Sequence, residues 1–505
     1  MEEFDVVVVG GGPGGATVAT LVAMQGHRTL LLEKEHLPRY QIGESLLPST
    51  VHGVCRLTGA WDLVKEAGFT KKRGGTFRWG ANPQPWTFTF SISSKMAGQT
   101  SFAYQVERMK FDQILVRNAE RKGVTVREGC TVTRVLSEAE RVSGLEYVDD
   151  GGATHRVNAK FVVDASGNGS RLHTHVGERR YSEFFRNLAL FGYFENGKRL
   201  PEPNSGNILS AAFDSGWFWY IPLTPTLTSV GAVVNRELAA KVQGDPEKAL
   251  MGLIRECPLI ADFLSSATRV TSGPYGKLRV RKDYSYHTTK FWRPGMVLVG
   301  DAACFVDPVF SSGVHLATYS ALLAARSINS VLTGGIDETT AFTEFERRYR
   351  REYGLFYEFL ISFYDMHHSE DSYFWNAKKV TASELPELES FVELVGGVAS
   401  TEARIVQSGV EVGTAEVAQR IANGSAEFTD ALEKAAAEDE GAMLPLLKSA
   451  VAGQALRESS EIQAQAMYGV DAENELPLFE DGLIVSPDGM SWSHLAAEVP
   501  HRSAT

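Results

Sequence analysis

The chain has few cysteines, no long apolar run and no excess of positive charge. Its four cysteines lack the paired spacing of a metal site, so we assign no metal and expect a reducing, cytoplasmic environment. They are Cys55, Cys130, Cys257 and Cys304. No apolar stretch approaches the roughly 20 residues that a membrane-spanning helix needs. The first residues run directly into an expected strand, so we expect no secretion signal.

The charge balance limits the partners further. Acidic side chains number 62 and basic ones 50, and the net charge of -12 argues against a nucleic-acid-binding surface. Hydrophobic residues make up 43% of the 505 residues, which is enough to fill two or more cores. We therefore expect an enzyme of several parts, with neither a nucleic acid nor a membrane as a partner.

The first 35 residues have the pattern of a dinucleotide-binding βαβ unit. A β-branched run leads into Gly10, Gly12 and Gly15, which satisfy Gly-x-Gly-x-x-Gly. Such glycines allow a tight turn, close approach of the backbone to a pyrophosphate, and close packing of helix on strand. We expect a helix over 14–25 and then a second strand that ends in Glu33, a carboxylate placed to accept the ribose hydroxyls.

Two later segments each combine an apolar strand with a glycine-containing turn, and they carry Asp164 and Asp301 at the strand ends. A carboxylate there can hold a ribityl hydroxyl while the following helix faces a phosphate. We find no second Gly-x-Gly-x-x-Gly at a strand-to-helix junction, so no separate nicotinamide domain is indicated. Together these segments resemble the aromatic-hydroxylase-like FAD superfamily, which implies FAD as the cofactor.

The same resemblance implies the fold class. It is an α/β protein with a Rossmann-type FAD-binding domain, an inserted substrate β-sheet and a mainly helical C-terminal region. We assign the FAD-binding domain to 1–75, 105–185 and 275–335, the substrate sheet to 76–104 and 186–274, and the C-terminal region to 336–505. From 342 to 366 the apolar spacing becomes helical, and we expect that apolar stripe to pack in a core, with the lining of a substrate entrance as the alternative.

Aromatic hydroxylases, isoprenoid-chain reductases and flavin-dependent halogenases share this fold, so local motifs must distinguish them. The loop with Arg39 and Gly43-Glu44-Ser45 resembles the one that follows the second strand in halogenases and their relatives. Arg108 lies in an element that resembles the one whose arginine reaches FAD. The resemblance implies that Arg39, Glu44, Ser45 and Arg108 contact the cofactor.

A Trp-x-Trp-x-Ile-Pro signature is formed by Trp217, Trp219, Ile221 and Pro222. In a strand the two indoles point to one face, and an aromatic run of this kind is commonly a sheet core. The signature also resembles the hallmark of flavin-dependent halogenases, in which it is thought to keep the organic substrate away from the flavin and suppress direct monooxygenation. Reductases of this fold can carry a related aromatic stretch.

A basic run, Lys71-Lys72-Arg73, precedes an expected strand that contains Trp79. Taken alone, this basic run indicates a solvent-exposed surface. Halogenases have a lysine upstream of such a strand, between flavin and substrate, and counting back from Trp79 gives Lys71, with Lys72 as the main competitor. An ammonium can donate a hydrogen bond to hypochlorous acid, and a neutral amine can form a chloramine. Lysine suits both roles because burial lowers its pKa.

The segment Phe310-Ser311-Ser312-Gly313 resembles the loop that covers the flavin ring and offers N–H groups to chloride in halogenases. By position, Ser312 and Gly313 would hold the halide, and Ser311 would relay polarisation to the lysine. Tryptophan-type halogenases have a glutamate where this chain has Phe310, which we expect on the substrate side. This departure is typical of the branch that modifies phenolic or pyrrolic groups, often on a carrier protein, including the chondrochloren and chloramphenicol pathway halogenases.

The resemblance thus implies a halogenase of secondary metabolism that depends on FADH2, O2 and chloride. A separate flavin reductase would supply FADH2, a flavin C4a-peroxide would oxidise chloride to a hypochlorous species, and the lysine would relay it. The substrate would be an electron-rich, phenolic aromatic, free or carrier-bound. The alternatives are an aromatic monooxygenase, an isoprenoid-chain reductase, and a binding protein of this fold that has lost its flavin.

Overall fold

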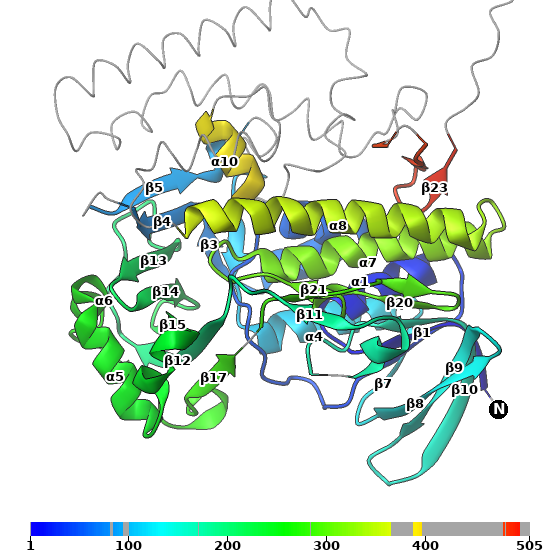
Figure 1. The fold of residues 1–505 in the computed structure, drawn as a ribbon, viewed down its shortest axis with the longest axis horizontal. Coiled ribbons are helices and arrows are strands. Elements are labelled where there is room, and N and C mark those ends of the chain that lie inside the picture. The colour runs from blue at the N-terminus through cyan, green and yellow to red at the C-terminus, as the bar shows by residue number, and fades with distance from the viewer. Residues whose placement is uncertain are drawn as a thin grey trace, which may run out of the picture.

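In the computed structural model, the described residues are 2–80, 84–93, 100–169, 171–282, 284–364, 387–395, 478–479 and 481–494 (Figure 1). The first large sheet has eight strands in the order β19-β20-β10-β1-β2-β7, with β9 pairing β10 and β8 pairing β9. The strands are β1 (Glu2–Val9), β2 (Thr29–Leu32), β7 (Thr125–Arg127), β8 (Thr131–Glu138), β9 (Arg141–Val148), β10 (Thr154–Asp164), β19 (Trp292–Arg293) and β20 (Met296–Leu298).

The centre of this sheet is parallel and buried on both faces. β1 pairs in parallel with β10 on one side and with β2 on the other. Val6, Val7 and Val8 are fully buried, as the β-branched run predicts. Helix α1 (Pro13–Met24) follows β1 and packs against α4 (Arg108–Arg121) and α7 (Ser312–Leu332). The predicted βαβ unit is confirmed, and the carboxyl ends of its strands meet at one edge of the sheet.

A second sheet of eight strands stands beside the first. Its order is β16-β12-β15-β14-β13-β4-β5, and β17 pairs β12. The strands are β4 (Gly74–Arg78), β5 (Trp86–Thr89), β12 (Asn187–Glu195), β13 (Ile208–Phe213), β14 (Gly216–Pro222), β15 (Leu227–Asn235), β16 (Thr268–Arg269) and β17 (Arg279–Lys282). This sheet therefore joins two segments distant in sequence. It also takes in β17, a segment that we had grouped with the FAD-binding part from the sequence.

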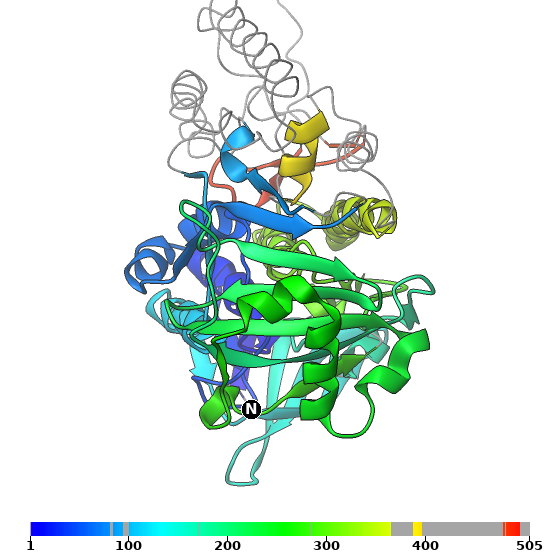
Figure 2. The same ribbon diagram turned by 90° about the vertical axis from the view of Figure 1, so that its left-hand side faces the viewer.

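Strand β14 carries the tryptophan signature through the middle of this sheet. Trp217 and Trp219 face the main core, whereas Phe218 and Tyr220 face a smaller core under helices α5 (Pro246–Glu256) and α6 (Pro258–Phe263). Figure 2 shows these two helices, in green, on the outer side of the sheet. The predicted alternation of the strand is confirmed, and it directs both indoles toward the first sheet.

Two long helices, α7 and α8 (Glu338–Phe363), run side by side in Figure 1 and pack against each other. The apolar stripe of α8 is buried, as predicted for a core-facing helix. Its members are Phe345, Tyr349, Phe356, Phe359, Leu360 and Phe363. Helix α10 (Glu387–Val395) lies near β5. Much of the predicted helical C-terminal region, including 396–477, lies outside the described residues.

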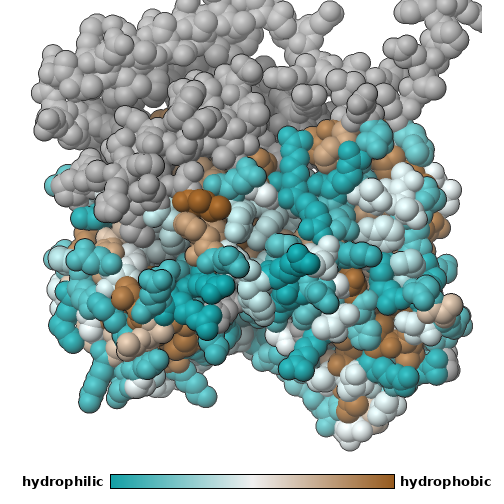
Figure 3. Space-filling model, in the orientation of Figure 1, coloured by the Kyte–Doolittle hydropathy of each residue, from teal (hydrophilic) through white to brown (hydrophobic). Residues whose placement is uncertain are grey.

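The remaining described elements are short. They are η1 (Ser49–Val54), α2 (Cys55–Leu57), α3 (Trp61–Glu66), β3 (Thr70–Lys72), η2 (Phe90–Ile92), β6 (Ala103–Gln105), η5 (Leu172–His175), β11 (Arg179–Tyr181), η6 (Arg236–Val242), η7 (Gly273–Tyr275), β18 (Tyr286–Thr288), η8 (Gly300–Ala302), β21 (Cys304–Phe305), β22 (Ile484–Val485) and β23 (Trp492–Ser493). No helix among the described residues is long and apolar enough to cross a membrane. The face in Figure 3 is mostly hydrophilic, with apolar side chains scattered over it.

Candidate active site

A cavity of about 870 Å³ opens between the carboxyl edge of the first sheet and the second sheet. This volume is within the usual range of about 300–1,000 Å³ for cofactor and ligand pockets. Among the residues that line it are Gly10, Gly12, Glu33, Arg39, Tyr40, Arg108, Trp219, Asp301 and Gly313. The cavity therefore brings together most of the regions that the sequence singled out, at the edge where α/β sheets bind nucleotides.

The glycine motif forms the floor at one end of the cavity. Gly10 has a φ of +107°, and a Cβ there would lie 2.4 Å from the carbonyl oxygen of Ala165. A Cβ on Gly15 would lie 1.9 Å from the carbonyl oxygen of Gly10. At Gly12 the nearest atom to a Cβ would be a guanidinium nitrogen of Arg39, 3.9 Å away. Gly10 and Gly15 are thus needed for packing, and Gly12 leaves its backbone open to a ligand.

Glu33 lies at the end of β2, where the sequence predicts a ribose-binding carboxylate. Its Oε2 accepts a hydrogen bond of 2.7 Å from the N–H of Gly11, and its Oε1 accepts one of 3.0 Å from the N–H of Glu35. The side chain is nearly buried and lines the cavity. These bonds hold the carboxylate beside the turn, with lone pairs left to accept from a ligand.

Arg39 and Arg108, both lining the cavity, share one buried carboxylate. Asp112 Oδ2 accepts from Arg39 at 2.7 Å, and Asp112 Oδ1 accepts from Arg108 Nε at 2.7 Å. The Asp112 side chain is fully buried. The sequence does not predict Asp112 as a site residue. Its partner Arg39 lies 73 positions away, and only Arg108, 4 positions away, has the spacing of a pair on one helix.

Four of the predicted cofactor contacts, Gly15, Glu44, Ser45 and Asp164, do not line the cavity. Ser45 is buried in an isolated bridge with Gln105. Asp164 is buried beneath the turn after β10, where its Oδ1 accepts from the N–H of Ser166 at 3.1 Å. Burial raises the pKa of the Asp164 carboxyl to about 6. Asp301, in contrast, does line the cavity, and burial raises its pKa also to about 6.

Glu44 reaches the cavity only through two tyrosines. Its Oε1 accepts from the Tyr193 hydroxyl at 2.7 Å, and that hydroxyl is 2.7 Å from the hydroxyl of Tyr40, which lines the cavity. Burial raises the pKa of Glu44 to about 7, and the Tyr193 hydrogen bond opposes part of this effect. In this structure Glu44 is therefore a buried acid that is linked to the cavity by two tyrosine hydroxyls, and it does not line the cavity itself.

Glu44→Gln is expected to make stability less dependent on pH. Glu44 has an ordinary pKa of 4.5 and a folded-state pKa of about 7. The folded protein therefore holds the extra proton between these values, and its stability falls as the pH rises through them. Glutamine keeps the acceptor for Tyr193 without titrating. As the pH rises through this window, the free energy of unfolding of the variant should therefore increase by about 3 kcal/mol relative to that of the native protein. Thermal unfolding at several pH values tests this, and parallel pH profiles would contradict it.

The two candidate lysines lie on opposite faces of β3. Lys71 is exposed, with its Nζ 4.9 Å from the centre of the Phe102 ring. Lys72 is buried, and its Nζ donates to the carbonyl oxygen of Leu46 at 3.1 Å and to Ser311 Oγ at 3.4 Å. Burial lowers the pKa of Lys72 to about 7. Neighbouring residues of a strand point to opposite faces, and of the two lysines only Lys72 points toward Ser311.

The predicted halide loop forms the N-terminus of α7. Ser311 precedes the helix with a φ of +61°, and its N–H donates to the carbonyl oxygen of Pro308 at 2.9 Å. Ser312 is fully buried, and its Oγ has no hydrogen-bond partner among the described residues. Gly313 lines the cavity, where a Cβ would lie 2.8 Å from the Phe305 ring. The first N–H groups of a helix lack helical partners and favour an anion.

Phe310 lies in an aromatic cluster. Its ring stacks on that of Phe359 with centroids 5.3 Å apart, and it meets the ring of Phe363 edge-on at 4.6 Å. Phe77 of β4 lies 6.1 Å away. The side chain is buried and does not line the cavity. In this structure Phe310 therefore packs between the second sheet and α8, away from the cavity.

Of the tryptophan signature, only Trp219 lines the cavity, and its Nε1 donates to Ser229 Oγ at 3.2 Å. The Nε1 of Trp217 donates to the Tyr364 hydroxyl at 2.8 Å, which donates to Asp307 Oδ2 at 2.8 Å. Burial raises the pKa of Asp307 to about 7. Ile221 and Pro222 are buried further along β14 and do not line the cavity.

A buried hydrogen-bonded chain lies below the halide loop. His315, in the first turn of α7, has Nδ1 2.9 Å from Ser49 Oγ and Nε2 2.6 Å from Glu352 Oε1. His315 and Glu352 are both buried. The chain ties together η1, α7 and α8. The sequence does not reveal it, because its members are 266 and 37 positions apart.

The model of the tryptophan halogenase family matches residues 5–97 and 92–424. The chain belongs to this family. It is 34% identical over 425 residues to the "Tryptophan 2-halogenase" of Chondromyces crocatus, covering 83% of this chain and 78% of that one. The solved structure of the myxobacterial chondrochloren halogenase CndH shares 51% identity and a TM-score of 0.74, covering 98% of this chain and 100% of that one. CmlS, a flavin-dependent halogenase, shares 32% identity over 81% of this chain and 79% of its own, with a TM-score of 0.68.

Membership of the halogenase family confirms the predicted fold class and enzyme class, a flavin-dependent halogenase of secondary metabolism. It decides against the hydroxylase, reductase and binding-protein alternatives, which share the scaffold only. Among the described residues, no group of three histidine, cysteine or acidic side chains is placed to hold a metal ion.

Proposed function

We propose that this halogenase chlorinates an electron-rich phenolic ring, using FADH2 from a separate flavin reductase, O2 and chloride. The observation that carries the proposal is Lys72. Its amine is buried beside Ser311, directly before the helix that offers unpaired N–H groups to an anion. A lysine with a pKa near neutrality, next to a halide seat, suits the handling of an electrophilic chlorine species.

The residues around the cavity fit FAD. The open backbone at Gly12 and the N-terminus of α1 would hold the pyrophosphate, and Glu33 would accept the ribose hydroxyls. Arg39 and Arg108 supply positive charge at the same wall, and the Asp301 carboxylate would hold a ribityl hydroxyl. When it is bound in its reduced form, FAD would activate O2 for the oxidation of chloride to hypochlorous acid.

The chain's own groups then bind and direct the halogen. The N–H groups of Ser312 and Gly313 would hold chloride at the start of α7, and Ser311 Oγ would connect this seat to Lys72. With a pKa of about 7, Lys72 is present at neutral pH both as ammonium and as amine. The ammonium can donate a hydrogen bond to the oxygen of hypochlorous acid, which makes its chlorine more electrophilic. The neutral amine can instead accept the chlorine itself. Trp219 lines the cavity and would keep the aromatic substrate away from the flavin.

The substrate class follows from the residue before Ser311. Phe310 packs among aromatic rings, so this position offers no carboxylate to take the ring proton. A phenol activates its own ring and releases its own proton, so it does not need that carboxylate. An indole is the second candidate, because a relative bears the name tryptophan 2-halogenase. We propose phenols, free or bound to a carrier protein, as the first class to test.

The test incubates the protein with a flavin reductase, chloride, O2, and free phenols, carrier-bound phenols or tryptophan. We expect mass spectra with the isotope pattern of chlorine on a phenol. An oxygenated product that forms without chloride would instead mean monooxygenation. Chlorination of tryptophan alone would overturn the substrate class but keep the halogenation chemistry.

A further inference from the structure

Three side chains, which we call the Glu44 chain, connect a buried acid to the flavin cavity. Glu44 Oε1 and the Tyr193 hydroxyl oxygen are 2.7 Å apart, and the Tyr193 and Tyr40 hydroxyl oxygens are also 2.7 Å apart. Glu44 and Tyr193 are buried, and Tyr40 lines the cavity. Both distances are those of ordinary O–H···O hydrogen bonds, so each of the two gaps holds one proton.

Two orders of the protons keep one proton in each gap. An ionised Glu44 can only accept, so Tyr193 donates to Glu44 and Tyr40 donates to Tyr193. Tyr40 then offers the cavity a lone pair. A protonated Glu44 can donate to Tyr193, which donates its single proton to Tyr40, and Tyr40 then donates into the cavity. The protonation of Glu44 therefore sets whether the Tyr40 hydroxyl accepts or donates a hydrogen bond in the cavity.

The Glu44 chain meets the cavity at the wall formed by the second sheet. Phe191 and Tyr193 lie on one face of β12, because side chains two positions apart in a strand share a face. Phe191 lines the cavity, and its ring centroid is 5.5 Å from that of Trp219. The loop that carries Glu44 also reaches α7, since a Cβ on Gly43 would lie 3.8 Å from Val314. The chain is thus linked to the wall that carries Trp219.

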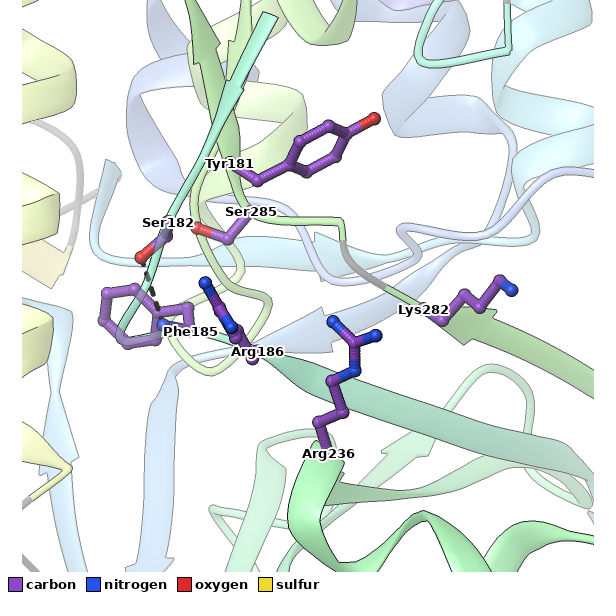
Figure 4. A pocket seen from close by; sticks show the side chains of 7 residues that line it. All are labelled: Tyr181, Ser182, Phe185, Arg186, Arg236, Lys282 and Ser285. Carbon is purple, nitrogen blue, oxygen red and sulfur yellow. Dashed lines mark hydrogen bonds between the residues drawn. The ribbon is translucent and has the colours of Figure 1, made fainter.

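Figure 4 shows a second and smaller cavity, of about 370 Å³. Its described lining residues, which the figure labels, include none of the three members of the Glu44 chain. Tyr40, in contrast, is among the residues that line the larger cavity. Of these two cavities, the flavin cavity is therefore the one that a proton from Glu44 would reach.

The surroundings of Glu44 allow both of its protonation states near neutral pH. Burial raises its pKa to about 7, the Tyr193 hydrogen bond and the charge of Arg108 oppose this rise, and the charge of Glu107 adds to it. The Tyr275 hydroxyl donates to Glu107 Oε1 at 3.1 Å, and its ring lies beside that of Tyr193 with centroids 4.5 Å apart. The other charged or titratable side chains that act on Glu44 or Tyr40, among the described residues, are Arg108, Glu107, Tyr275, Arg279 and Arg281.

We propose that Glu44 donates a proton to the flavin cavity through Tyr193 and Tyr40, given the proposed use of this cavity by FAD. One proton passes from Glu44 to Tyr193, one from Tyr193 to Tyr40, and one from Tyr40 to an acceptor in the cavity. Each tyrosine loses one O–H bond and regains one, Glu44 becomes a carboxylate, and no electrons are transferred. The proposed chemistry consumes this proton, because chloride, O2, FADH2 and one proton together give hypochlorous acid, FAD and one water molecule.

A ligand atom that accepts a hydrogen bond from Tyr40 should favour the protonated form of Glu44. If Tyr40 donated to the ligand while Tyr193 donated to an ionised Glu44, two oxygens 2.7 Å apart would face each other with no proton between them. Carbonyl, ring-nitrogen and phosphate atoms make FAD rich in such acceptors. Binding of FAD should therefore take up a proton, and the affinity for FAD should fall as the pH rises through the pKa of Glu44.

The test measures proton uptake during FAD binding, without turnover. Oxidised FAD is titrated into the full-length protein, freed of flavin, about one pH unit above the pKa of Glu44. Calorimetry in phosphate and in Tris gives the number of protons taken up, because the ionisation heats of these buffers differ. We expect the native protein to take up a large fraction of one proton more than Glu44→Gln or Tyr193→Phe. Its affinity for FAD, followed by flavin fluorescence, should fall by up to about tenfold per pH unit, and both variants should show a flatter profile.

Tyr275→Phe is the matched control. It removes a hydroxyl from a ring that packs beside Tyr193, but that hydroxyl bonds to Glu107 and lies outside the Glu44 chain. This variant should keep the proton uptake of the native protein. If Glu44→Gln does not fold, Tyr40→Phe takes its place, because it leaves Glu44 intact and removes the end of the chain at the cavity.

The outcomes separate failure of the relay from failure of the proposed cofactor. Equal proton uptake in the native protein, Glu44→Gln and Tyr193→Phe would overturn the relay, and so would proton release. An equal loss of proton uptake in Tyr275→Phe and Tyr193→Phe would also overturn it. FAD binding with no linked proton would refute the relay alone, whereas no FAD binding by the native protein would refute the proposed cofactor and the relay together.

Discussion

Lys72→Met is expected to lower chlorination about 100-fold or more while leaving FAD binding intact. Lys72 is buried with its amine 3.4 Å from Ser311 Oγ, and it does not line the flavin cavity. Methionine fills a similar volume without an amine, so the loss should fall on transfer of chlorine and not on cofactor affinity. Chlorinated product per FADH2 consumed measures that step directly, and flavin fluorescence measures cofactor binding.

The chain supplies its own matched control, Lys71→Met. Lys71 is the adjacent residue, exposed on the opposite face of β3, so its loss should change chlorination little. The reverse pattern, with Lys71→Met inactive and Lys72→Met active, would refute the assignment made from the geometry. Equal activity of both variants with the native protein would remove lysine from the mechanism.

The pH dependence of the unfolding free energy shows whether Lys72→Met loses activity through catalysis or through misfolding. The pKa of Lys72 is lowered by burial from 10.5 to about 7, so between these values the unfolded chain binds more protons than the folded protein. The native protein therefore gains stability as the pH rises through this window, and loses it as the pH falls toward 7. Lys72→Met should remove this slope, and at neutral pH it should unfold no earlier than the native protein.

Asp112→Ala is expected to cost about 3–5 kcal/mol of unfolding free energy, together with most of the affinity for FAD. The carboxylate is fully buried and bonded to both Arg39 and Arg108 at 2.7 Å. Its removal leaves two guanidinium groups in a wall of the cavity without their shared counter-charge. Denaturant unfolding gives the free energy, and flavin titration gives the affinity.

An exposed ion pair on the same helix provides the control for Asp112. Glu120 pairs with Arg117 at 2.9 Å, and both side chains are more than a third exposed. Glu120→Ala should therefore cost less than about 1 kcal/mol. If Asp112→Ala cost no more than Glu120→Ala, the two arginines would not depend on the buried carboxylate.

Local patterns were enough to predict the cofactor half of the molecule. Strand, glycines, helix and Glu33 follow one another within 35 residues, and the geometry of each comes from its immediate neighbours. The faces of β14 were also predictable, because alternation along a strand needs no knowledge of its partners.

The positions that sequence reasoning leaves open depend on distant contacts. The choice between Lys71 and Lys72 is set by the pairing of β3 with β6, in which Lys72 lies opposite Ala103. A slip of one residue exchanges the two faces, and counting from Trp79 cannot resolve it. The surroundings of Phe310 have the same kind of origin, because the rings that contact it come from β4 and α8.

The Ser49, His315 and Glu352 chain bears on which halogen the enzyme takes. Hydrogen bonds of 2.9 and 2.6 Å hold the first turn of α7 from below, through side chains of η1 and α8. The proposed seat at Ser312 and Gly313 would thus be preorganised to accept an anion without rearranging. A rigid seat cannot widen to follow a larger guest. If the proposed seat binds a halide, discrimination between chloride and bromide would depend on ionic radius and on a histidine that contacts neither ion.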